Sequence, residues 1–208
     1  MPRLELQLNL PNQLTLLRIV LTPVFVVMLL SSSPLARQAS LAVFIIAALT
    51  DWYDGWIARK LGYVSRWGKF LDPLADKILS SAALVAFAAL GLVSAWMVWV
   101  IIVRDFLITG LRTYAEYRDH PVVTSRSAQA KTFSQFVVIY YILILYVARS
   151  IPSVNAEFGP WIDTLMQYNV LFGMMLLVTI MTVWTGIAYL VENRKTLRSI
   201  YGSVHTER

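Results

Sequence analysis

Six long apolar stretches divide this chain. They are Leu14–Leu30, Ala39–Leu61, Phe70–Gly91, Ala95–Tyr114, Phe133–Ala148 and Val170–Val191. Each approaches or exceeds the ~18–20 residues that an α-helix needs to cross a bilayer. Hydrophobic residues make up 58% of the 208 residues and charged residues only 14%, and both values depart from those of soluble domains. The sequence therefore predicts an all-α, polytopic membrane protein with six transmembrane helices in a single domain over residues 1–208.

Basic residues are distributed unevenly around the predicted spans. With six spans both termini share one side of the membrane, and only Arg37 and Arg149 of the 18 Lys and Arg residues fall on the other. Because basic residues favour the cytoplasmic side, we expect both termini to face the cytosol. Leu14–Leu30 is not followed by a small-residue cleavage site, so we expect this span to be retained. Basic residues near anionic lipids explain the net charge of +6, and no nucleic-acid partner is expected.

A longer connection precedes the last predicted span. Ile151-Pro152 and Gly159-Pro160 are typical of turns. The connection is mildly acidic, with Glu157 and Asp163, and Trp161 is suited to anchoring it at a membrane interface. We therefore expect an outward-facing loop over residues 150–167.

Four aspartates lie in or beside the second and third apolar stretches. At 100° per residue, one helical stripe of the second stretch contains Asp51, Asp54, Gly55, Ala58 and Arg59. The next stretch repeats the pattern with Gly68, Asp72 and Asp76. Two antiparallel helices joined by a short loop can therefore direct four carboxylates into one gap.

These carboxylates predict a site for hard cations. Carboxylates are costly in hydrocarbon and survive where they face a bundle interior or a wet cavity. Oxygen ligands without nearby Cys or His suit Mg²⁺ or Mn²⁺, and the chain contains no cysteine. Four acidic groups can hold two such ions, and two-metal sites stabilise both the attacking and the leaving oxygen of a phosphoryl displacement. The small residues would let a ligand approach the backbone, and Arg59 would add a charge for a phosphate.

A structural explanation covers only part of this pattern. Gly55, Ala58 and Gly62 are also typical of a packing face between membrane helices. Asp72 before Pro73 is also typical of a helix N-cap. Neither explanation accounts for Asp51, Asp54 and Asp76.

The complete spacing, Asp-x2-Asp-Gly-x2-Ala-Arg-x8-Gly-x3-Asp-x3-Asp from Asp51 to Asp76, resembles the signature of the CDP-alcohol phosphotransferases. Its eight fixed positions make the match far more specific than a lone glycine-rich loop. The resemblance implies transfer of a phosphatidyl-type group from a CDP-alcohol to an acceptor hydroxyl, with release of CMP.

A second group of charged residues lies downstream. Arg104 and Arg112 are two turns apart, hence on roughly one helical face, and Arg118, Arg126 and Lys131 follow in a polar segment. An arginine within an apolar run needs a partner or a ligand. For Arg104 that partner is either an anionic acceptor or a carboxylate, such as that of its neighbour Asp105. Taken together, these cations suit an acceptor that carries a phosphate.

A narrower resemblance is to bacterial phosphatidylglycerophosphate synthases. It is carried by Asn9–Arg18, Thr50–Gly55, Phe70–Lys77, Arg104-Asp105-Phe106 with Gly110-Leu111-Arg112, and Lys131-Thr132 with Gln135. The chain has Ala128-Gln129-Ala130 before Lys131, where the members compared show Gly-Lys-x, so one basic residue of that pattern is absent.

This resemblance implies CDP-diacylglycerol as donor, sn-glycerol 3-phosphate as acceptor, a bacterial cytoplasmic membrane and a homodimer. Each site residue then has an implied role. Two Mg²⁺ or Mn²⁺ ions would be held by Asp51, Asp54, Asp72 and Asp76, with Asp76 also the general base. The nucleotide would be bound by Gly55, Ala58, Arg59 and Gly68. The acceptor phosphate would be bound by Arg104, Arg112 and Lys131.

Three alternatives remain at this point. A cardiolipin, phosphatidylserine or phosphatidylinositol-phosphate synthase would differ only in its acceptor. An ion-coupled transporter would also contain membrane-embedded carboxylates, but such proteins tend to show repeated halves, and residues 1–104 and 105–208 show no duplication. A prenyltransferase would need a second aspartate-rich segment in the other half of the chain, and the sequence has none.

Overall fold

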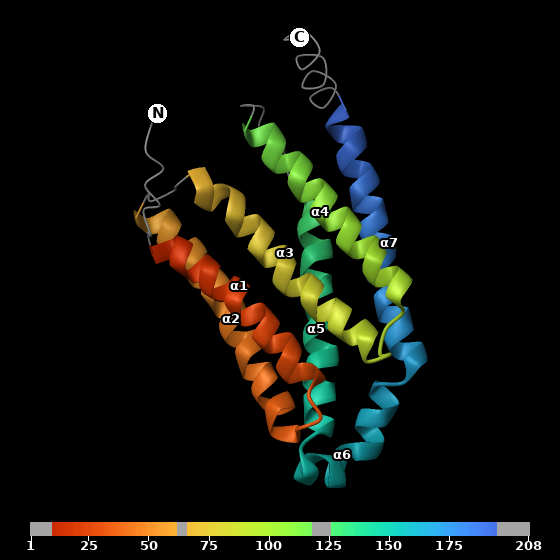
Figure 1. The fold of residues 1–208 in the computed structure, drawn as a ribbon. Helices are drawn as coiled ribbons and strands as arrows, with labels where there is room; N and C mark the ends of the chain where they lie inside the picture. Colours follow the sequence, from red (N-terminus) through yellow and green to blue (C-terminus); the bar gives the residue numbers. More distant parts are fainter. Residues whose placement is uncertain (1–9, 62–65, 118–125, 195–208) are drawn as a thin grey trace. The chain divides into compact units, whose positions relative to one another are not determined.

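The computed structural model describes residues 10–61, 66–117 and 126–194, and every regular element in these ranges is an α-helix (Figure 1). The elements are α1 (Leu10–Leu30), α2 (Pro34–Leu61), α3 (Arg66–Ala89), α4 (Ala95–Tyr117), α5 (Arg126–Arg149), α6 (Pro152–Leu165) and α7 (Tyr168–Glu192). Within these helices, side chains 10–12, 51–61, 66–74, 76, 116–117 and 126 lie outside the description. The all-α prediction is confirmed for the described residues. The chain forms two compact units, residues 1–86 and 87–208, and each is described by itself.

In the first unit, α1 and α2 pack against each other as a hairpin. Phe25 and Leu29, one turn apart on α1, are fully buried, and so are Phe44 and Ala47 on α2. The rings of Phe25 and Phe44 lie 5.0 Å apart between centroids. Pro34 begins α2, because a proline in the first turn of a helix forgoes no intrahelical hydrogen bond. Apolar side chains at helical spacing therefore hold the pair together.

In the second unit, α7 packs against both α4 and α5. Its buried face consists of Leu171, Met175, Val178, Thr179, Thr182, Thr185, Gly186 and Tyr189. Large apolar side chains on the opposite face, such as Leu177 and Trp184, are exposed, as expected of a helix that faces lipid. The turn before α4 depends on Gly91, whose φ of 71° is left-handed and is easily reached only by glycine.

Each of the six predicted stretches coincides with a helix, within five residues at its ends except at the start of α5, which begins seven residues before Phe133. In the part of the chain that the structure describes, Gln13–Leu30, Ser127–Arg149 and Tyr168–Glu192 are long and apolar enough to cross a membrane. Pro34–Thr50 and Lys77–Ala89 form shorter apolar helical pieces. The helices fit a membrane protein, while the count of six spans and the orientation of the termini stay predictions.

The expected loop at 150–167 is wrong, because Pro152–Leu165 is the helix α6. Pro152 lies in the first turn, where its missing N–H costs nothing, and Asn155 N donates to Ile151 O at 2.9 Å to close that turn. At 1.5 Å per residue the helix is about 21 Å long, too short to cross a bilayer. It buries Gly159 and Ile162 and packs on α5.

Candidate active site

The predicted metal ligands lie on two helices of the first unit. Asp51 and Asp54 belong to the C-terminal part of α2, and Asp72 and Asp76 to the first half of α3. The backbone is helical through both segments, so each pair occupies one face of its helix, as its spacing predicts. Their side chains fall outside the described residues. So do those of the predicted nucleotide-binding residues, Gly55, Ala58 and Arg59 on α2 and Gly68 on α3.

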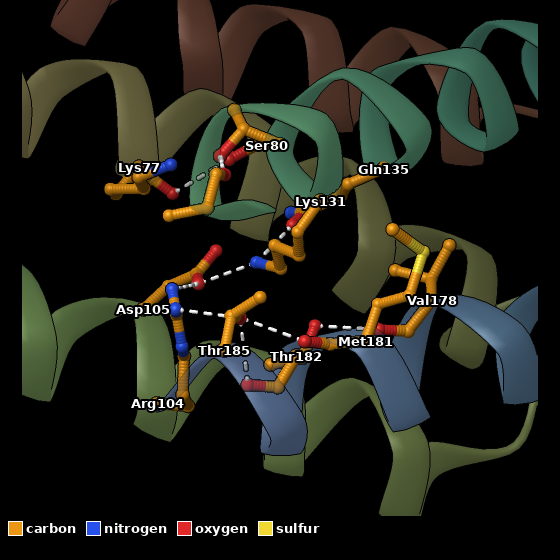
Figure 2. A network of polar contacts seen from close by, with 12 residues as sticks. Lys77, Ser80, Arg104, Asp105, Lys131, Gln135, Val178, Met181, Thr182 and Thr185 are labelled. Carbon is orange, nitrogen blue, oxygen red and sulfur yellow. Dashed lines mark hydrogen bonds and ion pairs between the residues drawn. The ribbon is translucent and has the colours of Figure 1, made fainter. Parts of the chain in front are cut away.

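Among the described side chains, a buried polar cluster in the second unit joins three helices (Figure 2). Its members, named here the Asp105 cluster, are Arg104, Asp105, Lys131, Gln135 and Thr185. Asp105 lies on α4, and its Oδ1 accepts hydrogen bonds from Lys131 Nζ on α5 at 2.5 Å and from Arg104 Nη1 at 3.1 Å. One carboxylate oxygen therefore serves two cations. Such charge-assisted bonds are stronger than those between neutral groups.

Lys131 is fully buried, with 0% of its side chain exposed. Besides Asp105, its ammonium donates to Gln135 Oε1 at 2.7 Å, and Gln135 lies one turn further along α5. A buried ammonium requires such acceptors, because its hydration is lost. Lys131, near the start of α5, is therefore buried at a place where Asp105 and Gln135 accept hydrogen bonds from its ammonium.

Arg104 is held from a third helix. Its Nη2 donates to Thr185 Oγ1 on α7 at 2.8 Å, and Thr185 Oγ1 in turn donates to Met181 O at 2.7 Å. Gly186 lies beside the arginine stem, since a Cβ built at this position would be 3.2 Å from Arg104 Cγ. Gly186 thus leaves room for the side chain of Arg104 next to Thr185.

Within the Asp105 cluster, two cations share one carboxylate oxygen. The side chain of Arg104 is 16% exposed. Its Nε is buried and has no hydrogen-bond partner in the described part of the protein. Buried donors in proteins normally have an acceptor, and an oxygen atom of an anionic ligand could serve as the acceptor of this one.

Comparison with known proteins places these features in a family. The CDP-alcohol phosphatidyltransferase family matches residues 8–192. This chain belongs to that family. It is 37% identical over 203 residues to the CDP-diacylglycerol–glycerol-3-phosphate 3-phosphatidyltransferase of Bacillus subtilis, covering 92% of this chain and 98% of the relative.

Relatives with the same name in Rickettsia bellii and Salmonella typhimurium are each 37% identical, over 136 and 144 residues. Those alignments cover 65% and 66% of this chain, and 75% and 78% of the relatives.

In this phosphatidyltransferase, the donor set on α2 and α3 fits the divalent cations that the family implies. Asp51, Asp54, Asp72 and Asp76 offer only hard carboxylate oxygens, which suit Mg²⁺ or Mn²⁺. The side chains of this quartet lie outside the described residues, and the described ones contain no group of three or more His, Asp or Glu that could hold a metal ion. The quartet is therefore the metal site to test.

The three predicted acceptor-binding residues of the phosphatidyltransferase differ in their surroundings. Arg104 and Lys131 are brought together by Asp105, whereas Arg112 is exposed two turns further along α4. The ion pair between Arg104 and Asp105 that the sequence allowed is present. Arg104 also donates to Thr185 on α7, so its contacts are not limited to the ion pair within α4.

Sequence reasoning missed Thr185 and Gly186, because α7 was characterised by hydropathy alone. A signal was present. Thr179, Thr182 and Thr185 recur every three residues in an otherwise apolar helix, and each donates its hydroxyl to a backbone carbonyl on the buried face. Hydroxyl groups on one stripe of a membrane helix indicate a polar contact with a neighbouring helix.

Proposed function

We propose that this protein transfers the phosphatidyl group of CDP-diacylglycerol to sn-glycerol 3-phosphate, giving phosphatidylglycerophosphate and CMP. The observation that carries the proposal is the extent of the match. The relative named for this reaction aligns over 92% of the chain, and the family match over residues 8–192 spans all four aspartates of the motif and the Asp105 cluster. The family match runs through both compact units, which supports a single functional domain.

The reaction exchanges the phosphoanhydride bond of the donor for a phosphodiester bond to the acceptor. The primary hydroxyl oxygen of the acceptor bonds to the phosphatidyl phosphorus, and the bond from that phosphorus to the bridging oxygen of CMP breaks. The hydroxyl proton passes to Asp76, which acts as general base. Asp51, Asp54, Asp72 and Asp76 would hold two divalent ions, which supply charge neutralisation for the pyrophosphate. Gly55, Ala58, Arg59 and Gly68 would bind the nucleotide.

Arg104, Arg112 and Lys131 would bind the phosphate of the acceptor. The two cations that share Asp105 Oδ1 and the unpartnered Nε of Arg104 support this role. Lys131 is buried, so a direct bond requires its ammonium to exchange a present acceptor for a phosphate oxygen. Arginine is suited to this task because its planar donors match phosphate oxygens two at a time.

The proposed setting is a cytoplasmic membrane crossed by α1, α2, α3, α4, α5 and α7, with both termini and the site on the cytosolic side. The lengths of these helices support it, because each has 21 to 28 residues and ~20 are needed to span a bilayer. The donor would keep its acyl chains in lipid while its headgroup reaches the site. We also propose a homodimer, which rests on the family resemblance alone.

The test is release of CMP from CDP-diacylglycerol by purified protein in detergent. Glycerol 3-phosphate, serine, inositol phosphate and phosphatidylglycerol are supplied in turn, with Mg²⁺, Mn²⁺ or EDTA. We expect release with glycerol 3-phosphate, sustained by either ion and abolished by EDTA. Release only with another acceptor would identify a different synthase of the same family. Full activity in EDTA would contradict the metal site.

A further inference from the structure

The contacts of Asp105 connect the two buried cations of the second unit. Asp105 is 2% exposed and Lys131 0% exposed, and they lie on α4 and α5. Because Arg104 Nη1 binds the same oxygen, the position of that oxygen sets the positions of both cations. Removing one partner from a buried ion pair is costly, so loss of the carboxylate should disturb the positions of both cations.

Thr185 fixes Arg104 from the opposite side. A hydroxyl has one proton and two lone pairs, and the acceptors of this proton are backbone carbonyls of α7, Met181 O at 2.7 Å and Thr182 O at 3.2 Å. The lone pairs are therefore turned outward from α7, and one of them accepts from Arg104 Nη2 at 2.8 Å. The guanidinium is thus held between a carboxylate on its own helix and a hydroxyl 81 positions away in sequence, as Figure 2 shows.

We propose that Asp105 and Thr185 are positioning residues for acceptor binding, holding the guanidinium of Arg104 and the ammonium of Lys131 ready for the acceptor's phosphate. The proposal rests on the proposed function, because it assigns those two cations to the acceptor. A side chain that is ordered before binding does not lose its freedom when the ligand arrives, so binding is tighter. Asp105 and Thr185 act through the cations and do not touch the acceptor.

The test separates the Michaelis constant for glycerol 3-phosphate from that for CDP-diacylglycerol in purified protein. Thr185→Val keeps the shape of the side chain and removes the hydroxyl that accepts from Arg104 Nη2. It should raise the KM for glycerol 3-phosphate about 2- to 10-fold. Asp105→Ala should raise it about 10-fold or more, and Asp105→Asn, which keeps one oxygen, should fall between wild type and Asp105→Ala. The KM for CDP-diacylglycerol should stay within about 2-fold.

Thr179→Val is the matched control. Thr179 is also buried on α7 and also donates to a backbone carbonyl, Met175 O at 2.7 Å, but its recorded hydrogen bond goes to its own helix. We expect its KM for glycerol 3-phosphate to match that of wild type. An equal rise in Thr179→Val and Thr185→Val would mean that any lost hydroxyl on α7 has this effect, and would overturn the proposal.

A double-mutant cycle separates positioning from general folding. In a Lys131→Met background, Asp105→Asn should raise the KM for glycerol 3-phosphate by a smaller factor than in wild type, because one of the two cations that Asp105 positions is already absent. Equal factors in both backgrounds would contradict the proposal, and so would a lower KM in Asp105→Asn, which would show that the carboxylate competes with the acceptor. If Asp105→Ala does not fold, Asp105→Asn and Thr185→Val carry the test. Wild-type protein inactive with glycerol 3-phosphate refutes the proposed function itself, whereas active wild type with unchanged variants refutes only the positioning role.

Discussion

Lys131 on α5 and Asp105 on α4 form a buried ion pair, in which the distance from Nζ to Oδ1 is 2.5 Å. The two residues are 26 positions apart in the sequence. Two buried charges do not stabilise a protein simply by being paired, because each has lost its hydration. The pair does, however, make each member depend on the other. α4 and α5 are consequently joined at one defined register, where an ammonium meets a carboxylate.

This dependence predicts an asymmetric effect on stability. Asp105→Ala alone should lower the free energy of unfolding by about 3–5 kcal/mol, because it leaves buried positive charge without its partner. Adding Lys131→Met should recover part of that loss by removing one uncompensated charge. Thermal unfolding in detergent measures both effects. A double variant less stable than Asp105→Ala would contradict the account.

The general base is the subject of a second prediction. Asp76→Asn should lower kcat by about 10²–10⁴-fold, because the amide cannot take the proton of the acceptor hydroxyl. The measurement is CMP release at saturating substrates, and near-normal turnover would refute the role. Asp163→Asn is the control, since Asp163 is 55% exposed on α6, pairs with Arg149 and is not one of the proposed site residues. Its kcat should not change.

Two glycines of α7 should respond differently to a methyl group. In a helix, Gly→Ala normally stabilises by up to about 1 kcal/mol. Gly173→Ala should show this gain, because a Cβ there would have nothing within 4 Å. Gly186→Ala should show less or none, because its Cβ would press on Arg104 Cγ at 3.2 Å. Melting temperatures compare the two, and an equal gain would show that Arg104 moves aside freely.

Gly186→Ala should also raise the KM for glycerol 3-phosphate relative to Gly173→Ala, because a displaced stem misplaces the guanidinium. Substrate titrations of the two variants give this comparison directly. An unchanged KM in Gly186→Ala would separate the packing of Arg104 from its proposed role at the acceptor.

The absence of cysteine makes the topology directly testable. Ser153 lies on α6 and Ser127 at the start of α5, and both are exposed. With six spans, Ser153→Cys should react with a membrane-impermeant maleimide in intact cells, whereas Ser127→Cys should react only after the cells are opened. Cys-free wild-type protein is the background control. Labelling of both variants in intact cells, or the reverse order, would contradict the proposed orientation.

Local patterns were enough to predict α1 to α5 and α7, and the helical register of the aspartates. Apolar runs of membrane-spanning length coincide with helices, and the backbone is helical at all four aspartates between Asp51 and Asp76, as their spacing of three or four residues predicts. Both follow from backbone geometry, because residues three or four apart in a helix share a side whatever lies beyond them. Proline was ambiguous at this level. Pro152 is as compatible with the first turn of a helix as with a loop, and in the helix that formed Gly159 and Ile162 are buried and α6 packs on α5.

The partners of the charged residues could not be predicted in this way. Arg104 had two candidate partners in the sequence, a ligand and Asp105, and its contact with Thr185 spans 81 positions. Lys131 was assigned to the acceptor, yet its ammonium lies against Asp105 and Gln135 in the interior. Helical periodicity states which residues share a face, but not which face meets which. That is decided by the long-range packing of α4, α5 and α7, where a buried charge is stable only if another helix supplies its acceptor.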